Sequence, residues 1–166
     1  LHLLNNASRG MVVKGVSVWR SNHHTMNIHG ANGILVEDVV SYDTGDSGIF
    51  LEKTCSSGSP GPGCLAGPPF VIGDNIDNYF IHNLVVKVYF KALQTSRTAG
   101  FWISNFHNFF ADNVVVSTFG SQAGGYHFEE GPENEWNQYL IFMVREEAHS
   151  NNNGMFTWSN TDVPPH

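Results

Sequence analysis

The chain contains a short acidic stretch that could act on a sugar chain. Asp43, Asp46 and Glu52 are its members, and they follow a polar bend that contains His29. Polysaccharide lyases hold Ca²⁺ with carboxylates, whose oxygens suit this hard cation, and they need a basic residue to remove the proton next to the sugar carboxyl group. Only Lys53 adjoins the acidic stretch in sequence, so a lyase site is not supported. Ca²⁺ is the one cofactor these acids could hold, and no other metal site is indicated.

A second acidic pair fits glycoside hydrolysis. Glu52 and Glu129 occupy the same position of a repeat described below, with Ser104 in the copy between them. If each copy is a coil stacked about 4.8 Å above the last, the two glutamates lie roughly 10 Å apart. That spacing is compatible with the two carboxyl groups of an inverting glycosidase. The alternative is that these carboxylates decorate a solvated face.

Histidines offer a further candidate. His29 could serve as a general base near neutral pH or as a metal ligand. The alternative is a ring that hydrogen-bonds the backbone of a neighbouring coil. His23 and His24 precede it, but adjacent residues of a strand point to opposite faces, so this pair is not expected to bind a metal together.

Aromatic rings could stack on sugar faces, and Trp19, Trp102 and Tyr126 are the candidate carbohydrate-binding residues. Trp102 shares its repeat position with Phe50, Phe156 and His127. Stacked rings at one position could instead stabilise the fold, and we favour this role for Trp102. The sequence leaves the role of Trp19 open.

These residues are positioned by a degenerate repeat of about 25 residues, which is typical of a β-solenoid. Its first half covers residues 35–40, 80–85, 110–115 and 136–141, and its second half covers 48–52, 100–104, 125–129 and 154–158. One coil of this length cannot bury its own apolar face, so the coils must stack. Two positions are expected to fill the interior, one with Val39, Leu84, Val114 and Leu140, the other with Ile49, Phe101, Tyr126 and Met155.

Bends separate the strands of each copy. Asp38, Asn83 and Asn113 are expected at one bend, where short polar side chains tolerate a left-handed backbone. A weaker copy over residues 12–18 places Gly15 there and adds a fifth coil. The sequence therefore predicts an all-β fold, a right-handed parallel β-helix of about five coils, over a single domain 1–166.

The charge and composition of the chain limit the kinds of molecule that it can bind. The 166 residues carry a net charge of −7 with only 8 Lys and Arg, which disfavours nucleic acid. An anionic polysaccharide would be repelled on average, although a local patch could override the mean. No apolar run is long enough to span a membrane. Both ends look cut within the repeat, so we expect a fragment of a larger protein whose remaining sequence caps the coils.

A loop of Pro, Gly and Ser interrupts the repeat over residues 55–64, bounded by Cys55 and Cys64. A disulfide closing this loop would stabilise the fold by roughly 2 to 3 kcal/mol, and unpaired thiols are the alternative. Asn6 begins a glycosylation sequon, Asn-Ala-Ser, which is consistent with secretion.

Several phrases resemble the β-helix region of the family formed by the cell-migration-inducing hyaluronan-binding protein, its transmembrane relative and the fibrocystins. The phrases are Ile-His-Gly-Ala-Asn-Gly at 28–33, Tyr-Asp at 42–43, Ile-Phe-Leu-Glu at 49–52, Phe-Trp-Ile-Ser-Asn at 101–105 and Asp-Asn-Val at 112–114. The resemblance spans roughly residues 10 to 130. It implies a right-handed β-helix in a large secreted or membrane-tethered glycoprotein, with hyaluronan binding or depolymerisation known for some relatives.

This chain departs from the family pattern at three places. Asn32 replaces the second His of the first phrase, Asp46-Ser47 stand where the family has Gly-His, and Lys53-Thr54 replace the Asp-Gly that follows the Glu. The expected role is structural or adhesive, with an extracellular polysaccharide or glycoprotein, or neighbouring domains or subunits, as partner. A polysaccharide-degrading enzyme and an assembly subunit of an extracellular filament or coat are the alternatives. The expected location is extracellular or at the cell surface.

Overall fold

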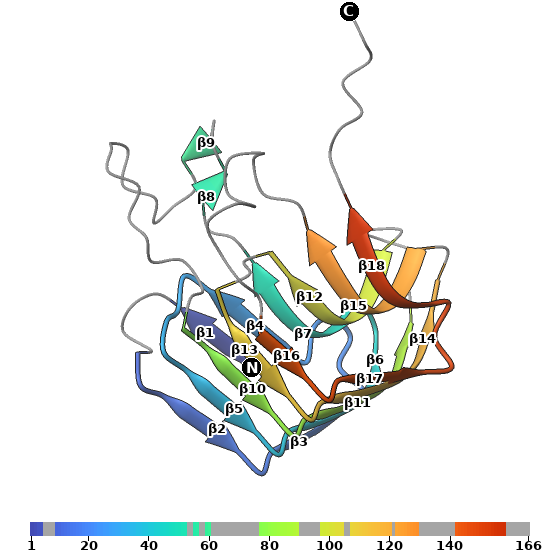
Figure 1. The fold of residues 1–166 in the computed structure, drawn as a ribbon, viewed down its shortest axis with the longest axis horizontal. Coiled ribbons are helices and arrows are strands. Elements are labelled where there is room, and N and C mark those ends of the chain that lie inside the picture. Colours follow the sequence, from blue (N-terminus) through green and yellow to red (C-terminus); the bar gives the residue numbers. More distant parts are fainter. Residues whose placement is uncertain are drawn as a thin grey trace, which may run out of the picture.

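The chain folds into parallel strands that stack coil upon coil. The computed structural model describes residues 1–4, 9–52, 55–56, 59–60, 77–89, 97–104, 107–120, 122–129 and 142–158. Within these ranges all regular secondary structure is β-strand (Figure 1). None of the described segments is a helix long and apolar enough to cross a bilayer.

Three parallel sheets make up the stack. Sheet A contains β1 (His2–Leu4), β4 (Met26–His29), β7 (Ser47–Glu52), β12 (Arg97–Ile103), β15 (Gln122–Glu129) and β18 (Asn153–Trp158). Sheet B contains β2 (Val12–Lys14), β5 (Leu35–Glu37), β10 (Tyr79–Ile81), β13 (Phe109–Ala111) and β16 (Phe142–Val144). Sheet C contains β3 (Ser17–Trp19), β6 (Val40–Thr44), β11 (Leu84–Tyr89), β14 (Val114–Phe119) and β17 (Glu147–His149).

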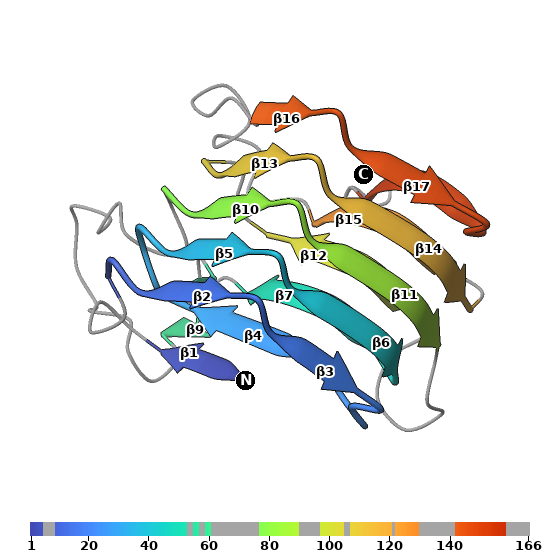
Figure 2. The ribbon, with the colours of Figure 1, turned by 90° about the horizontal axis from the view of Figure 1, so that it is seen from below.

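Each coil visits sheets A, B and C in turn, and Figure 2 shows sheets B and C rising in the same order. The chain completes this circuit through β17 and then adds β18 to sheet A. The predicted parallel β-helix of about five coils is therefore confirmed. The weak amino-terminal copy forms β2 and β3, with Gly15 left-handed between them at φ 65°.

A small hairpin interrupts the coils after β7. Its antiparallel strands are β8 (Cys55–Ser56) and β9 (Ser59–Pro60), and the coil resumes at β10. Figure 1 shows the hairpin projecting away from the stacked sheets. The cysteine side chains and Asn6 lie outside what the structure describes, so the disulfide and the glycosylation site stay predictions.

One predicted interior column is confirmed. Ile49, Phe101, Tyr126 and Met155 are Cα partners on successive strands of sheet A, and the first three are buried. The Phe101 and Tyr126 rings stack with centroids 5.3 Å apart. Met155, on the last strand, is 58% exposed.

The other predicted column is wrong by one residue. Val39 is buried, but Leu84 pairs with Val40 on one side and with Val114 on the other, and Leu84 and Val114 are only half-buried. The buried residues beside Val39 are Asn83 and Asn113. Leu140 and the predicted copy at 136–141 lie outside the described residues, and the strand that pairs with β13 is β16.

The observed register differs by one residue from the predicted one because the left-handed backbone conformation falls on a different residue at the bend between sheets B and C. The left-handed residues at this corner are Gly15, Asp38, His82, Asp112 and Arg145. Asp38 was predicted correctly, whereas Asn83 and Asn113 follow the bend and turn inward. There Asn83 Oδ1 accepts the Val39 N–H at 2.9 Å, and Asn83 Nδ2 donates to the Val36 carbonyl at 3.0 Å. An amide can thus fill an interior position because it hydrogen-bonds the backbone of the coil beside it.

Candidate carbohydrate-contact surface and histidine cluster

The outer side of sheet A brings two predicted catalytic residues together. His29 on β4 and Glu52 on β7 are Cα partners on adjacent strands. The His29 ring is half-buried and lies 4.7 Å, centroid to centroid, from the ring of His2 on β1. The side chains of Glu52 and Glu129 lie outside the described residues. The backbone register nevertheless places Ser104 between them, as predicted, because Ile103 pairs with both Leu51 and Phe128.

A ladder of rings runs along the same outer face. The His24 ring stacks on Phe50 at 4.1 Å with an interplanar angle of 14°. Phe50 contacts Trp102 at 5.5 Å, and Trp102 contacts His127 at 4.0 Å between centroids. Trp102 is 7% exposed and His127 is 1% exposed, so this ladder packs within the protein. The structural role favoured for Trp102 agrees with this burial.

Tyr126 does not lie on an outer surface. Its ring is an interior residue at 2% exposure, and its hydroxyl donates to the Asn113 carbonyl at 3.0 Å. Burial raises the pKa of the Tyr126 phenol well above its ordinary range. A sugar face could not reach this ring, so Tyr126 contributes packing and one hydrogen bond rather than a carbohydrate contact.

Trp19 is exposed at the end of β3. Its ring is 69% exposed and lies 5.3 Å from that of Tyr42, its Cα partner on β6. The Lys87 ammonium lies 5.9 Å from the centroid of the Tyr42 ring. Two neighbouring rings and a cation are therefore accessible together on the outer side of sheet C.

Charged side chains flank these rings toward the end of sheet C, where Asp43 lies within β6, Lys87 within β11 and Arg20 directly after β3. Lys87 Nζ lies 2.7 Å from Asp43 Oδ1, and Arg20 Nε lies 3.9 Å from Asp43 Oδ2. The hydrogen bond that Lys87 donates to Asp43 raises the pKa of Lys87, so the amine is protonated at neutral pH. Arg20, Asp43 and Lys87 are all left-handed, which marks them as successive residues of one column. We call Trp19, Arg20, Tyr42, Asp43 and Lys87 the Trp19 surface.

This arrangement corrects two expectations from sequence. Lys53 is not the only base beside the acidic stretch, because Lys87 contacts Asp43 from the next coil. Asp43 and Asp46 were grouped together, yet Asp43 pairs with these cations while Asp46 contacts histidines. Contacts between coils are invisible in a linear sequence unless the register is known.

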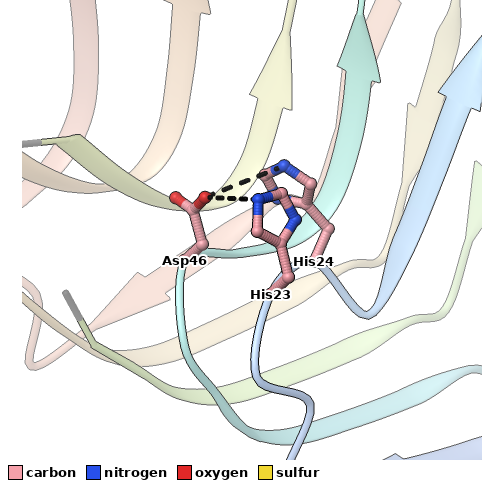
Figure 3. Close-up of side chains that lie close together, drawn as sticks. All are labelled: His23, His24 and Asp46. Carbon is pink, nitrogen blue, oxygen red and sulfur yellow. Dashed lines mark ion pairs between the residues drawn. The ribbon is translucent and has the colours of Figure 1, made fainter. Parts of the chain in front are cut away.

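The second cluster consists of His23, His24 and Asp46 (Figure 3). Asp46 Oδ2 lies 3.5 Å from His23 Nε2 and 3.8 Å from His24 Nε2, and one nitrogen or oxygen of each residue falls within 4.8 Å of the others. The histidines lie between β3 and β4, and Asp46 lies between β6 and β7, so the cluster joins two successive coils.

The surroundings of the cluster set its protonation. Burial, helped by His23, His29 and His2, lowers the pKa of His24 to about 3, so this ring is neutral at physiological pH. Burial raises the pKa of Asp46, against the attraction of His23. The expectation that His23 and His24 do not bind a metal together placed both residues on a strand. Both residues lie in a bend, where the two-residue alternation of side chains does not apply.

Three parallel sheets that stack coil upon coil define the class of protein, a parallel β-helix. The chain belongs to the CEMIP β-helix family, whose model matches residues 1–156.

The human cell surface hyaluronidase CEMIP2 is 26% identical to this chain over 133 residues. The match covers 74% of the chain and 9% of that relative's length, so the chain corresponds to a small part of the relative. No solved structure matches the chain significantly.

Proposed function

We propose that this chain is a polysaccharide-contacting β-helix module of an extracellular or cell-surface protein, and that the Trp19 surface makes the contact. The observation that carries the proposal is the exposure of Trp19 beside Tyr42, with Lys87 over the second ring. The family relationship to a cell surface hyaluronidase supports an acidic polysaccharide such as hyaluronan as the ligand.

The chemistry of the surface matches an acidic sugar chain. A pyranose presents an apolar face of C–H groups that packs on an aromatic ring, and Trp19 offers a ring free on one side. A uronic acid also carries a carboxylate, which Arg20 can bind through two parallel N–H groups. Arg20 and Lys87 contribute two positive charges and Asp43 one negative charge, so the surface has a local charge of +1 although the chain carries −7.

Binding to size-defined hyaluronan oligosaccharides tests the proposal. Calorimetry on the full-length protein should detect binding that weakens at least tenfold in Trp19→Ala. A neutral glucan of the same length should bind more weakly than hyaluronan, and the difference should shrink at high salt because Arg20 and Lys87 supply the charge term. Phe142→Ala is the matched control, since Phe142 is also an exposed ring, at 54%, but lies on sheet B. Equal binding by Trp19→Ala and the wild type would refute the assignment.

A polysaccharide-degrading activity is the second candidate, favoured by the pairing of His29 with Glu52 across β4 and β7. A histidine and a carboxylate on neighbouring strands can supply a general base and acid to one substrate. Depolymerisation of hyaluronan by the full-length protein, followed by size-exclusion chromatography, should be lost in Glu52→Gln and in His29→Ala. Unchanged cleavage in both variants would reject these residues as the catalytic pair.

A further inference from the structure

We infer that His23, His24 and Asp46 form a binding site for a divalent transition metal of the zinc type, linking the first two coils. The site is separate from the Trp19 surface, because neither its residues nor their contacts belong to that surface. The inference rests on three features: the spacing of the donor atoms, their chemical type and the packing that holds His24.

The donor spacing approaches that of a tetrahedral centre. Zinc lies about 2.0 to 2.2 Å from imidazole nitrogen and carboxylate oxygen, which places neighbouring donors roughly 3.3 Å apart. The distances from Asp46 Oδ2 are 3.5 Å to His23 Nε2 and 3.8 Å to His24 Nε2. Both are longer than an ordinary N–H···O hydrogen bond. One donor atom of each residue lies within 4.8 Å of the others, so modest side-chain rotation would bring both histidine nitrogens and the carboxylate around one ion.

The donor types select the metal class. Two imidazole nitrogens and one carboxylate oxygen suit zinc, copper or nickel, whereas Ca²⁺ takes six to eight oxygens. The His24 side chain is only 7% exposed, so an ion bound to it would be shielded from solvent on that side. The half-buried Asp46 would supply the compensating negative charge.

The His24 ring is held in place by packing. It stacks on Phe50 at 4.1 Å and meets the His23 ring edge-on at 3.9 Å. Among the described residues no group hydrogen-bonds its buried Nδ1, and the stacking on Phe50 orients Nε2 toward Asp46. Figure 3 shows both rings directed at the same carboxylate oxygen. Three protein donors leave a fourth position for water or an oxygen of another ligand, as in zinc sites with an open position.

The test uses Zn²⁺ alone with the tag-free full-length protein, dialysed against chelator. Calorimetry should show an affinity for Zn²⁺ that falls at least tenfold in His23→Gln and in Asp46→Asn. His149→Gln should leave it unchanged. This control removes an exposed His that lies 2.8 Å from Glu147 but belongs to no three-residue cluster among the described residues.

Thermal unfolding separates metal binding from misfolding. Because the metal would connect two coils, Zn²⁺ should raise the melting temperature of the wild type and of His149→Gln but not of His23→Gln. Because the His23 side chain is 54% exposed, His23→Gln should have the same melting temperature as the wild type when metal is absent. Equal Zn²⁺ affinity in the wild type and both cluster variants, or no binding to the wild type, would overturn the inference. Co²⁺ substitution should give a spectrum without thiolate bands, and such bands would assign the metal to the cysteines instead.

Discussion

Asn113 accepts two hydrogen bonds from Asn83 on the neighbouring coil, one from the backbone N–H at 2.9 Å and one from the side-chain amide at 2.8 Å. Asn113 in turn donates to the Phe80 carbonyl at 2.8 Å. Both side chains are buried. The bend between sheets B and C is therefore held from inside by stacked amides, which satisfy backbone groups that no strand pairs.

Removing one of these amides should destabilise the stack. Asn83→Ala leaves the Val39 N–H without the Asn83 Oδ1 acceptor and removes the amide that donates to the Val36 carbonyl. The loss should be about 2 to 3 kcal/mol in urea unfolding, because buried unpaired groups cost their full desolvation. Asn152→Ala, at an exposed asparagine, should change stability by less than about 0.5 kcal/mol. Equal losses in both variants would contradict this role for Asn83.

Glycine 100 should be irreplaceable because sheets A and C approach closely there. A Cβ on Gly100 would meet both methyl groups of Val115 and lie 2.7 Å from the Gly125 carbonyl. Backbone cannot move aside easily, so Gly100→Ala should cost about 3 kcal/mol. The control is Gly154→Ala at the same repeat position, where the nearest atom is 4.0 Å away. It should unfold at nearly the same urea concentration as the wild type. A Gly100→Ala protein of wild-type stability would refute the close approach.

Trp19 and Trp102 should respond oppositely to replacement by alanine. Trp102 is 7% exposed between Phe50 and His127, so Trp102→Ala should destabilise the protein by about 3 kcal/mol. Trp19 is 69% exposed, and Trp19→Ala should leave the melting temperature almost unchanged while it weakens hyaluronan binding. Thermal unfolding with parallel binding measurements separates the two roles. A large stability loss in Trp19→Ala would make that residue structural.

Glu146 should make stability depend on pH. Burial raises its pKa above the ordinary 4.5, although hydrogen bonds from Asn113 act in the opposite direction. The folded state therefore favours the protonated acid. The contribution of protonated Glu146 to the stability of the folded state is fully present below pH 4.5, and it is lost as pH rises through the raised pKa.

Glu146→Gln keeps an acceptor for Asn113 and cannot ionise. Relative to the wild type, this variant should gain stability at pH 8 compared with pH 4. Urea midpoints at the two pH values measure the change. An identical difference between variant and wild type at both values would show that the carboxyl group is not perturbed by folding.

Much of the fold was predictable because stacking repeats a local pattern. The glycines before Ile49, Phe101 and Tyr126 marked one column correctly, since sheets A and C approach too closely at Gly48, Gly100 and Gly125 to admit a Cβ. The other column failed because Leu84 is apolar and Asn83 polar, which suggested the wrong residue for the interior. Hydrogen bonding to backbone lets the amide go inside, and hydrophobicity alone does not report it.

For the candidate sites, too, some features follow from the sequence and others only from the tertiary structure. The sequence by itself determined the solenoid, the common register of Glu52 and Glu129, and the choice of His29 and Trp19 as candidates. Only the tertiary structure decided that Lys87 meets Asp43 and that Asp46 meets His23 and His24. Both sets of contacts join neighbouring coils. Asp43 and Lys87 are left-handed residues within sheet C, whereas His23, His24 and Asp46 lie between strands, and in neither place does side-chain direction follow the alternation of a regular strand.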